Sequence, residues 1–234
     1  MREIAAEVQA RGLADWGRAP ERNVNALFAG PRGTGKTLAA QVLAHTLERE
    51  LHRVDLVAAV SHHIGEMEKN LARVFDAAAG KGVLLFFDEA DALFGKRSQV
   101  KDAHDRYANQ EVAYLLQRIE SHPGIVILAS NRKTALDPAF IRRLHHVVDF
   151  PLPGIAERAQ IWARMFPVEA RAGQLDVERL ARFPLTGGSI REIALDAGLR
   201  AAQHDSGVTL ALIFEAVRRE LGKLGLPISE VDFR

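Results

Sequence analysis

The stretch Gly30–Thr37 constrains this chain more than any other, because it fits the P-loop pattern G-x-x-x-x-G-K-[ST] at every fixed position. An apolar, β-prone run at residues 24–29 precedes it, and apolar residues at helical spacing follow it between residues 38 and 51. We therefore expect a strand, a glycine loop whose backbone N–H groups turn inward, and then a helix. A glycine-rich turn that carries a lysine by chance is the alternative, and the flanking strand and helix argue against it.

The motif predicts a site for the phosphates of ATP and for Mg²⁺. The residues expected to line it are Gly30, Pro31, Arg32, Gly33, Thr34, Gly35, Lys36, Thr37 and Leu38. Lys36 would reach the β- and γ-phosphates, and the hydroxyl of Thr37 would ligate the metal ion.

A second informative stretch is Val83–Glu89. Its apolar residues suit a strand buried on both faces of a parallel sheet. Asp88 and Glu89 end that strand, where ligands bind in open α/β sheets. Together with the P-loop they predict a Walker B motif, in which Asp88 holds Mg²⁺ and Glu89 polarises the attacking water. The alternative is that both acids only cap the next helix.

Two further polar residues are candidates for the site. Asn131 follows the buried run 125–130 and could bind the nucleophilic water or the γ-phosphate, although an Asn that closes a turn is the alternative. After Pro151–Gly154 the chain reads as helical, and Ser189 with Glu192 matches a capping box. Arg191 would then lie in a first helical turn, where the dipole disfavours a cation, which suggests a functional residue.

Composition excludes several classes of protein. The 234 residues include no cysteine, so disulfides, thiolate nucleophiles and cysteine zinc sites are absent, and a reducing, cytoplasmic location is expected. A net charge of +1 gives no support for a nucleic-acid-binding surface, so nucleic acid is not an expected partner. No apolar run approaches the roughly 20 residues of a membrane span. The charged start, Met1–Arg11, does not resemble a signal peptide.

Taken in order, these elements resemble the AAA+ (AAA-type) ATPase module, from about Asn23 to the last helix. The resemblance assigns sensor 1 to Asn131 and sensor 2 to Arg191. It implies an α/β fold: a P-loop NTPase domain with a five-stranded parallel sheet flanked by helices (residues 1–152, of which 1–22 form a helix and linker), followed by a small all-α lid (153–234). ATP would lie between the two domains.

The resemblance also implies a homo-oligomeric ring, usually a hexamer, in which each site is completed by a neighbour. Arg142 best matches the finger that reaches the neighbour's γ-phosphate, where a cation stabilises developing charge. The commoner motif has a second arginine three positions later, but this chain has His145 there and its extra arginine at Arg143. Which arginine is the catalytic finger is therefore open. Without the resemblance, two arginines paired with surface acids would be the default.

The expected substrate pore loop is His62, His63, Ile64 and Gly65. Unfoldases of this family usually place an aromatic residue two positions before the glycine, where this chain has His63. Imidazole is smaller and can become charged near neutral pH, so grip on a threaded chain would be weaker or pH-dependent, or the ring would remodel assemblies without threading. A metal site at the paired histidines is disfavoured, because adjacent side chains rarely converge on one ion.

The narrowest resemblance is to bacterial AAA ATPases found beside contractile injection systems, carried by residues 88–109. Those proteins usually have extra sequence before the module, so an excised or a naturally short form is expected here. Two functions follow: an ATP-hydrolysing ring that remodels, assembles or disassembles a protein partner, including parts of a phage-tail-like apparatus, or a nucleotide-gated loader or assembly switch with slow turnover. A DNA motor is a weaker third reading. Trp16 and Gly17 are candidates for adenine contacts, and Trp16 is equally suited to the core.

Overall fold

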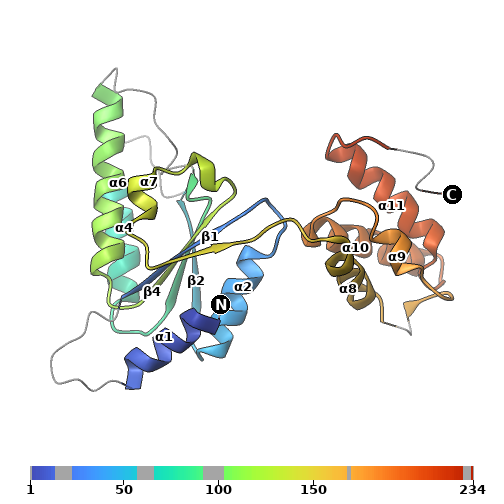
Figure 1. The fold of residues 1–234 in the computed structure, drawn as a ribbon, viewed down its shortest axis with the longest axis horizontal. Coiled ribbons are helices and arrows are strands. Elements are labelled where there is room, and N and C mark those ends of the chain that lie inside the picture. Colours follow the sequence, from blue (N-terminus) through green and yellow to red (C-terminus); the bar gives the residue numbers. More distant parts are fainter. Residues whose placement is uncertain are drawn as a thin grey trace. The chain divides into compact units, whose positions relative to one another are not determined.

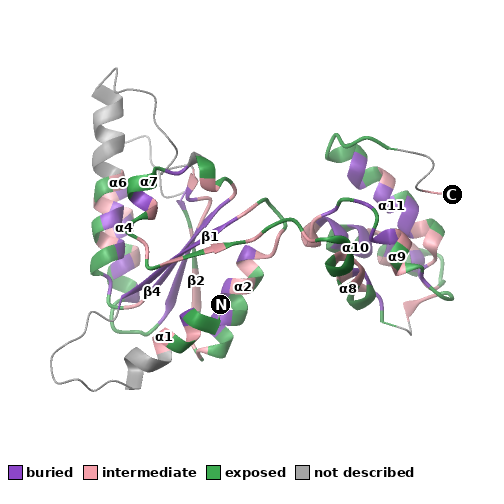
Figure 2. Cartoon of the chain, in the orientation of Figure 1, coloured by how far each residue is buried: buried purple, intermediate pink, exposed green. Residues whose placement is uncertain are grey.

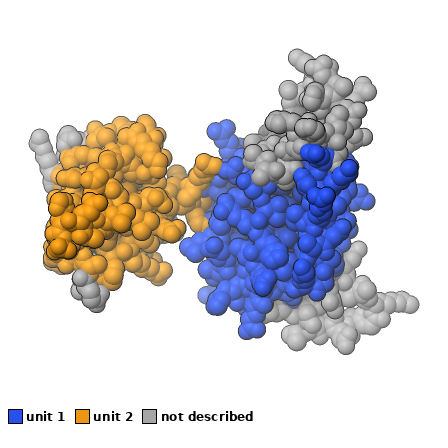
Figure 3. Space-filling view, turned by 180° about the vertical axis from the view of Figure 1, so that it is seen from behind, with its two compact units in different colours: residues 1–31, 36–150 blue, residues 32–35, 151–234 orange. Residues whose placement is uncertain are grey.

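The computed structural model describes residues 2–13, 23–56, 66–91, 103–167, 170–228 and 233. The chain divides into two compact units, coloured separately in Figure 3. The first unit comprises Met1–Pro31 and Lys36–Phe150, and the second comprises Arg32–Gly35 and Pro151–Arg234. The tip of the P-loop, Arg32–Gly35, thus groups with the C-terminal unit. The predicted boundary after residue 152 assigns this tip to the first domain instead.

The first unit is built on one parallel sheet (Figure 1), and its strands follow the order β2-β3-β4-β1-β5. The strands are β1 (Val24–Ala29), β2 (Leu51–Asp55), β3 (Leu84–Asp88), β4 (Ile125–Ser130) and β5 (His146–Asp149). Every residue of β1 and β4 is buried, because both faces of the sheet are covered by helices. The expected five-stranded parallel sheet is confirmed.

Helices cover the two faces of this sheet with separate apolar clusters. The helical segments of the unit are α1 (Arg2–Leu13), α2 (Lys36–Thr46), α4 (Glu66–Ala78), α6 (Ala103–Ser121), the 3₁₀ turn η1 (Lys133–Ala135) and α7 (Pro138–Ile141). Helices α1 and α2 pack on the face that carries Phe28 and Phe86, whereas α4 and α6 pack on the face of Leu85 and Phe87. Figure 2 shows the buried sides of these elements in purple.

The alternation of side chains along β3 fixes where its terminal acid lies. Phe86 faces the α1–α2 cluster and Phe87 faces the α4–α6 cluster. Asp88 follows Phe86 by two residues, so it leaves the sheet on the side of α2. This is the helix that begins at the end of the P-loop, and the Walker B carboxylate therefore shares a face with it.

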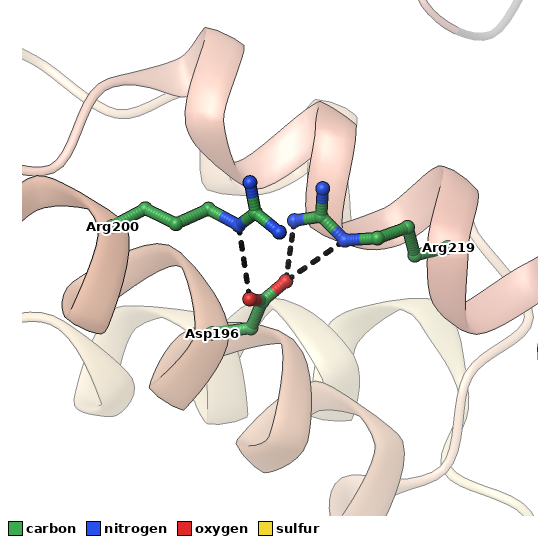
Figure 4. Close-up of polar contacts among 3 residues, drawn as sticks. All are labelled: Asp196, Arg200 and Arg219. Carbon is green, nitrogen blue, oxygen red and sulfur yellow. Dashed lines mark hydrogen bonds and ion pairs between the residues drawn. The ribbon is translucent and has the colours of Figure 1, made fainter.

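The second unit is helical and has its own core. It contains α8 (Ile155–Met165), α9 (Val177–Leu180), α10 (Gly187–Gln203) and α11 (Leu210–Lys223), which pack around the fully buried Trp162. Asp196 of α10 also links two helices of the unit, because it accepts hydrogen bonds from Arg200 on the same helix and from Arg219 on α11 (Figure 4).

No helix within the described ranges is both long and apolar enough to cross a membrane.

The start of α10 differs from the sequence-based expectation. The helix begins at Gly187, and its N-cap is Thr186, whose hydroxyl accepts from the backbone N–H of Ser189 at 3.1 Å. The expected capping box at Ser189 is therefore wrong. Thr186 and Ser189 have the same capping chemistry and lie three residues apart, and the helix uses the earlier one. Arg191 consequently lies beyond the first helical turn.

Candidate functional site

The P-loop adopts a conformation that depends on its glycines. Gly33 has a φ of 77° and Gly35 a φ of 99°, in the left-handed region that other residues rarely enter. Helix α2 starts immediately afterwards, at Lys36. Successive turns of this kind direct backbone N–H groups into a shared concavity, and the helix N-terminus adds its partial positive charge. The loop therefore fits an anionic phosphate chain.

Lys36 lies at the centre of the site and is only 7% exposed. Its Nζ donates to the carbonyl oxygens of Gly30 (2.6 Å) and Pro31 (2.9 Å), and to Oδ1 of Asn131 (3.1 Å). The sheet explains the last contact. Strands β1 and β4 are neighbours whose final residues pair, so the residues that follow each strand, Gly30 and Asn131, meet at the same edge.

The acids after β3 are engaged with residues from both neighbouring strands. Asp88 Oδ2 accepts from Arg53 Nη2 of β2 at 2.7 Å, and its Oδ1 accepts from the backbone N–H of Glu89 at 3.0 Å. Asp91 Oδ1 accepts from the backbone N–H of Asn131 at 3.1 Å. Polar contacts thus run along the carboxyl ends of four adjacent strands, from β2 through β3 and β4 to β1.

Glu89 stands at the strand end in a conformation unusual for its residue type. Its φ is 55°, in the left-handed region that few non-glycine residues adopt. Such residues persist where the surrounding structure fixes them, and they concentrate at functional sites. The hydrogen bond from its own N–H to Asp88 contributes to this fixation.

The donor set suits Mg²⁺ better than a metal held by protein ligands alone. Within the described ranges, no group of three or more His, Asp or Glu side chains gathers as a metal cage. Magnesium keeps several waters and is usually bound through one or two carboxylates together with substrate phosphates. Asp88 at the end of β3 and Thr37, the second residue of α2, provide a carboxylate and a hydroxyl of the required kind.

The two candidate finger arginines differ in their contacts. Both are exposed and follow α7. Arg143 Nε lies 3.1 Å from Glu120 Oε1, whereas Arg142 has no ion pair with any residue that the structure describes. His145 is occupied structurally, because its backbone N–H donates to Asn25 Oδ1 at 2.7 Å and its Nδ1 accepts from the backbone N–H of Asn25 at 3.3 Å.

In the second unit, the loop tip packs against the start of α10. The carbonyl oxygen of Gly33 accepts from the backbone N–H of Gly188 at 2.8 Å. A Cβ added to Gly33 would come within 2.4 Å of Thr186 Oγ1, so only glycine fits there. Arg191 lies on the exposed side of α10 and forms no ion pair within the described part of the chain.

The other predicted site residues are placed unevenly. Thr37 is half-buried and Leu38 is 63% exposed on α2. The pore-loop residues His62, His63, Ile64 and Gly65 and the adenine candidates Trp16 and Gly17 lie outside the described residues. Two contacts at the site were missed from the sequence: Arg53 on Asp88, and Asp91 on Asn131. A lone arginine in an edge strand gives no sequence signal, whereas the position of Asp91 three residues after Asp88 was a usable one.

Comparison with known proteins agrees with this geometry. The family model described as "ATPase family associated with various cellular activities (AAA)" matches residues 26–152. The chain is 33% identical over 205 residues to 26S proteasome regulatory subunit 7 of Caenorhabditis elegans, covering 78% of this chain and 46% of the relative. It is 32% identical over 206 residues to the proteasome-activating nucleotidase of Methanothermobacter thermautotrophicus, covering 84% and 50%.

A third relative is named for cell division. Cell division protein C of Sulfolobus acidocaldarius is 30% identical over 189 residues, covering 76% of this chain and 50% of the relative. The chain spans about half the length of these curated relatives. The relatives named here do not include an ATPase of a contractile injection system, so that narrower resemblance stays a prediction.

Proposed function

Because the chain belongs to the AAA family of ATPases, we propose that it binds ATP with Mg²⁺ at the carboxyl edge of its sheet, hydrolyses the nucleotide, and acts as a ring on a protein partner. The observation that carries the proposal is the convergence of Lys36, Asn131 and the acids after β3 at one edge. Residues up to 95 positions apart in sequence meet there.

The roles of these residues follow from their chemistry. Lys36 is held by two P-loop carbonyls, so its ammonium is pre-positioned beside the loop that takes the phosphates. Thr37 and Asp88 hold the metal ion. When bound, Mg²⁺ supplies positive charge that neutralises the β- and γ-phosphates. Glu89 orients and polarises the attacking water, and Asn131 positions that water or the γ-phosphate. Arg191 is the proposed nucleotide contact of the helical lid. The proposed domains are the nucleotide-binding domain, residues 1–152, and the lid, residues 153–234.

For the ring, we assign the trans-acting finger to Arg142. Arg143 is already paired with Glu120, so using it across an interface would break an existing ion pair. Arg142 is exposed beside it without such a pair among the described residues, and a finger must remain available to a neighbouring subunit. A homo-oligomeric ring, a hexamer in the commonest form, would complete each site in this way.

The proposed substrate is a protein. Two of the relatives are named for proteasome activation or regulation, and this supports an action on polypeptides by a pore loop at His62–Gly65. The cytoplasm is the proposed location. A component of a phage-tail-like contractile apparatus remains a narrower candidate for the target, supported only by the resemblance of residues 88–109.

A nucleotide-gated loader or assembly switch is the second candidate. The observation that favours it is Arg53 on Asp88, because a guanidinium beside the Walker B carboxylate opposes a metal ion there and would slow turnover. In this function ATP binding, and not repeated hydrolysis, would order the ring.

The test is ATPase activity per molecule as a function of protein concentration. Wild type should become more active as concentration rises, and Arg142→Ala should lose about 10³-fold or more of the activity at the highest concentration. Arg143→Ala, the matched control, should lose far less. Glu89→Gln should lower turnover by about 10²–10⁴-fold while nucleotide binding persists. Tight ATP binding with a flat, near-zero wild-type rate would favour the switch, and equal rates for wild type and Glu89→Gln would refute the role of Glu89.

A further inference from the structure

We propose that Arg53 is a positioning residue that competes with Mg²⁺ for the carboxylate of Asp88, and that it sets how strongly nucleotide binding depends on magnesium. This inference rests on the proposed Mg²⁺–ATP site. It concerns a residue of the edge strand β2, which no P-loop or Walker motif includes.

The strand register places Arg53 on the correct side of the sheet. Arg53 pairs with Phe86 of β3, and Phe86 faces the cluster that contains α2. Paired residues of neighbouring strands point to the same face, so Arg53 and Asp88 both leave the sheet on the side of α2. The guanidinium reaches forward along the strand to the carboxylate, with Nη2 at 2.7 Å from Oδ2.

The contact engages the oxygen atoms that a metal ion would use. Asp88 Oδ2 accepts from Arg53, and Oδ1 accepts from the backbone N–H of Glu89. A guanidinium and a divalent cation repel each other when both lie beside one carboxylate. A metal ion bound through Asp88, directly or through water, must therefore weaken or displace the bond to Arg53.

A metal ion can displace Arg53 from Asp88 because the arginine side chain is mostly exposed to solvent. The Arg53 side chain is 62% exposed, whereas that of Asp88 is 19% exposed. An exposed guanidinium on a long, flexible stem can move into solvent at low cost, and pairs of this kind are worth roughly 0.2–1 kcal/mol, which corresponds to about 1.4- to 5-fold in an equilibrium. Arg53 thus adjusts the affinity for the metal ion without blocking the site.

Removal of Arg53 should change nucleotide affinity in opposite directions with and without magnesium. With Mg²⁺ present, nothing competes for Asp88 and nucleotide should bind more tightly. In excess EDTA, the carboxylate loses its compensating cation and should repel the phosphates, so nucleotide should bind more weakly. The ratio of the two dissociation constants, EDTA over Mg²⁺, should therefore rise.

The experiment is a titration of the full chain with a fluorescent N-methylanthraniloyl derivative of ATP, in saturating Mg²⁺ and in excess EDTA. The ratio should rise about two- to fivefold in Arg53→Met. Arg53→Lys keeps the charge and should stay near wild type. Arg49→Met is the matched control, because Arg49 precedes the same strand but donates to the carbonyl of Gly82 at 2.6 Å, at the opposite end of β3.

Each outcome decides the inference. A raised ratio in Arg53→Met but not in Arg49→Met supports it. An unchanged ratio overturns it, including when Arg53→Met lowers the melting temperature of the nucleotide-free chain, since that result would make Arg53 only a strap between β2 and β3. If wild type binds the nucleotide with Mg²⁺ but Arg53→Met matches it, the inference alone fails. If wild type binds in neither condition, the proposed function fails as well.

Discussion

The carboxyl edge of the sheet and the helices α10 and α11 of the second unit both carry arginine–aspartate pairs, but their surroundings differ. Asp88 is 19% exposed and lies at an edge whose polar contacts include those of Asn131 and Lys36. Asp196 is 38% exposed, and among the described residues its ion pairs are with Arg200 and Arg219. The same pair type joins two helices in the second unit, whereas at the sheet edge it lies in the candidate site, because parallel strands bring their terminal residues together.

The largest difference between the two regions is expected from Lys36→Met at the sheet edge. This change removes a buried cation from three acceptors at the sheet edge. We expect ATP turnover to fall at least about 100-fold, as when a charge-stabilising donor is lost from an active site. Steady-state ATPase rates and nucleotide titration measure it. Lys223→Met in the second unit, which breaks the pair with Glu220, is the control, and a comparable loss in that variant would contradict the distinction.

Gly33→Ala tests whether the loop tip depends on its contact with Thr186 at the start of α10. Alanine would have to adopt a φ of 77° with its Cβ at 2.4 Å from Thr186 Oγ1. We expect a loss of about 1–3 kcal/mol in the free energy of unfolding, together with weaker nucleotide binding. Gly35→Ala provides a matched control, because its φ is 99° but no atom lies within 4 Å of the added Cβ. Equal losses measured by urea unfolding would mean that backbone strain alone matters and that the contact with Thr186 does not.

A smaller effect, on stability, is expected at His122. This residue precedes β4, at the opposite end of that strand from the candidate site. Burial lowers the pKa of His122 from 6.5, and the nearby Arg118 charge lowers it further. The unfolded chain therefore binds the proton first as pH falls through about 6.5, so stability should decrease from there down to the lowered pKa and then level off.

His122→Gln cannot take up this proton and should lose less stability over the same interval. The measurement is the urea midpoint of both proteins at pH 7.5 and 5.5. The ring packs edge-on against Phe75, so the variant is compared with itself across pH to remove any loss of packing. Identical pH dependence in the two proteins would refute the assignment.

The smallest change should follow Asp196→Asn in the second unit. Burial acts to raise the pKa of Asp196, but hydrogen bonds and charge from Arg219 and Arg200 outweigh it, so the pKa is lowered from 3.8. Because the group is partly exposed and screened, we expect a loss of at most about 1 kcal/mol at pH 7. The difference from wild type in thermal unfolding should shrink as pH falls below 3.8 through the lowered pKa, where the wild-type carboxyl also becomes neutral. A change in ATPase rate as large as that of Lys36→Met would contradict a purely structural role.

Local sequence was sufficient for the elements of the fold and for the conformation of the glycine-rich loop. The apolar runs predicted β1, β3 and β4, which are buried because helices cover both faces. Glycines at fixed spacing predicted the loop, since only glycine readily adopts its left-handed backbone. Hydrophobic periodicity and turn residues act over short distances, so they can be read in a single sequence. The local sequence did not predict the first residue of α10, because Thr186 and Ser189 are equally good N-caps. The structure uses Thr186, which is also the residue that lies close to Gly33.

Tertiary structure alone decided how the site is assembled. The strand order sets β3 beside β2, which brings Arg53 to Asp88 across 35 positions, and β4 beside β1, which brings Lys36 to Asn131 across 95. The fold also pairs Arg143, which follows α7, with Glu120 of α6 and leaves Arg142 outside that pair, a distinction that two adjacent arginines do not show in the sequence. Such contacts depend on which strands are neighbours and in what register, and that is a property of the whole sheet. The sequence therefore identified the candidate residues for the chemistry, and the sheet determined which of them meet.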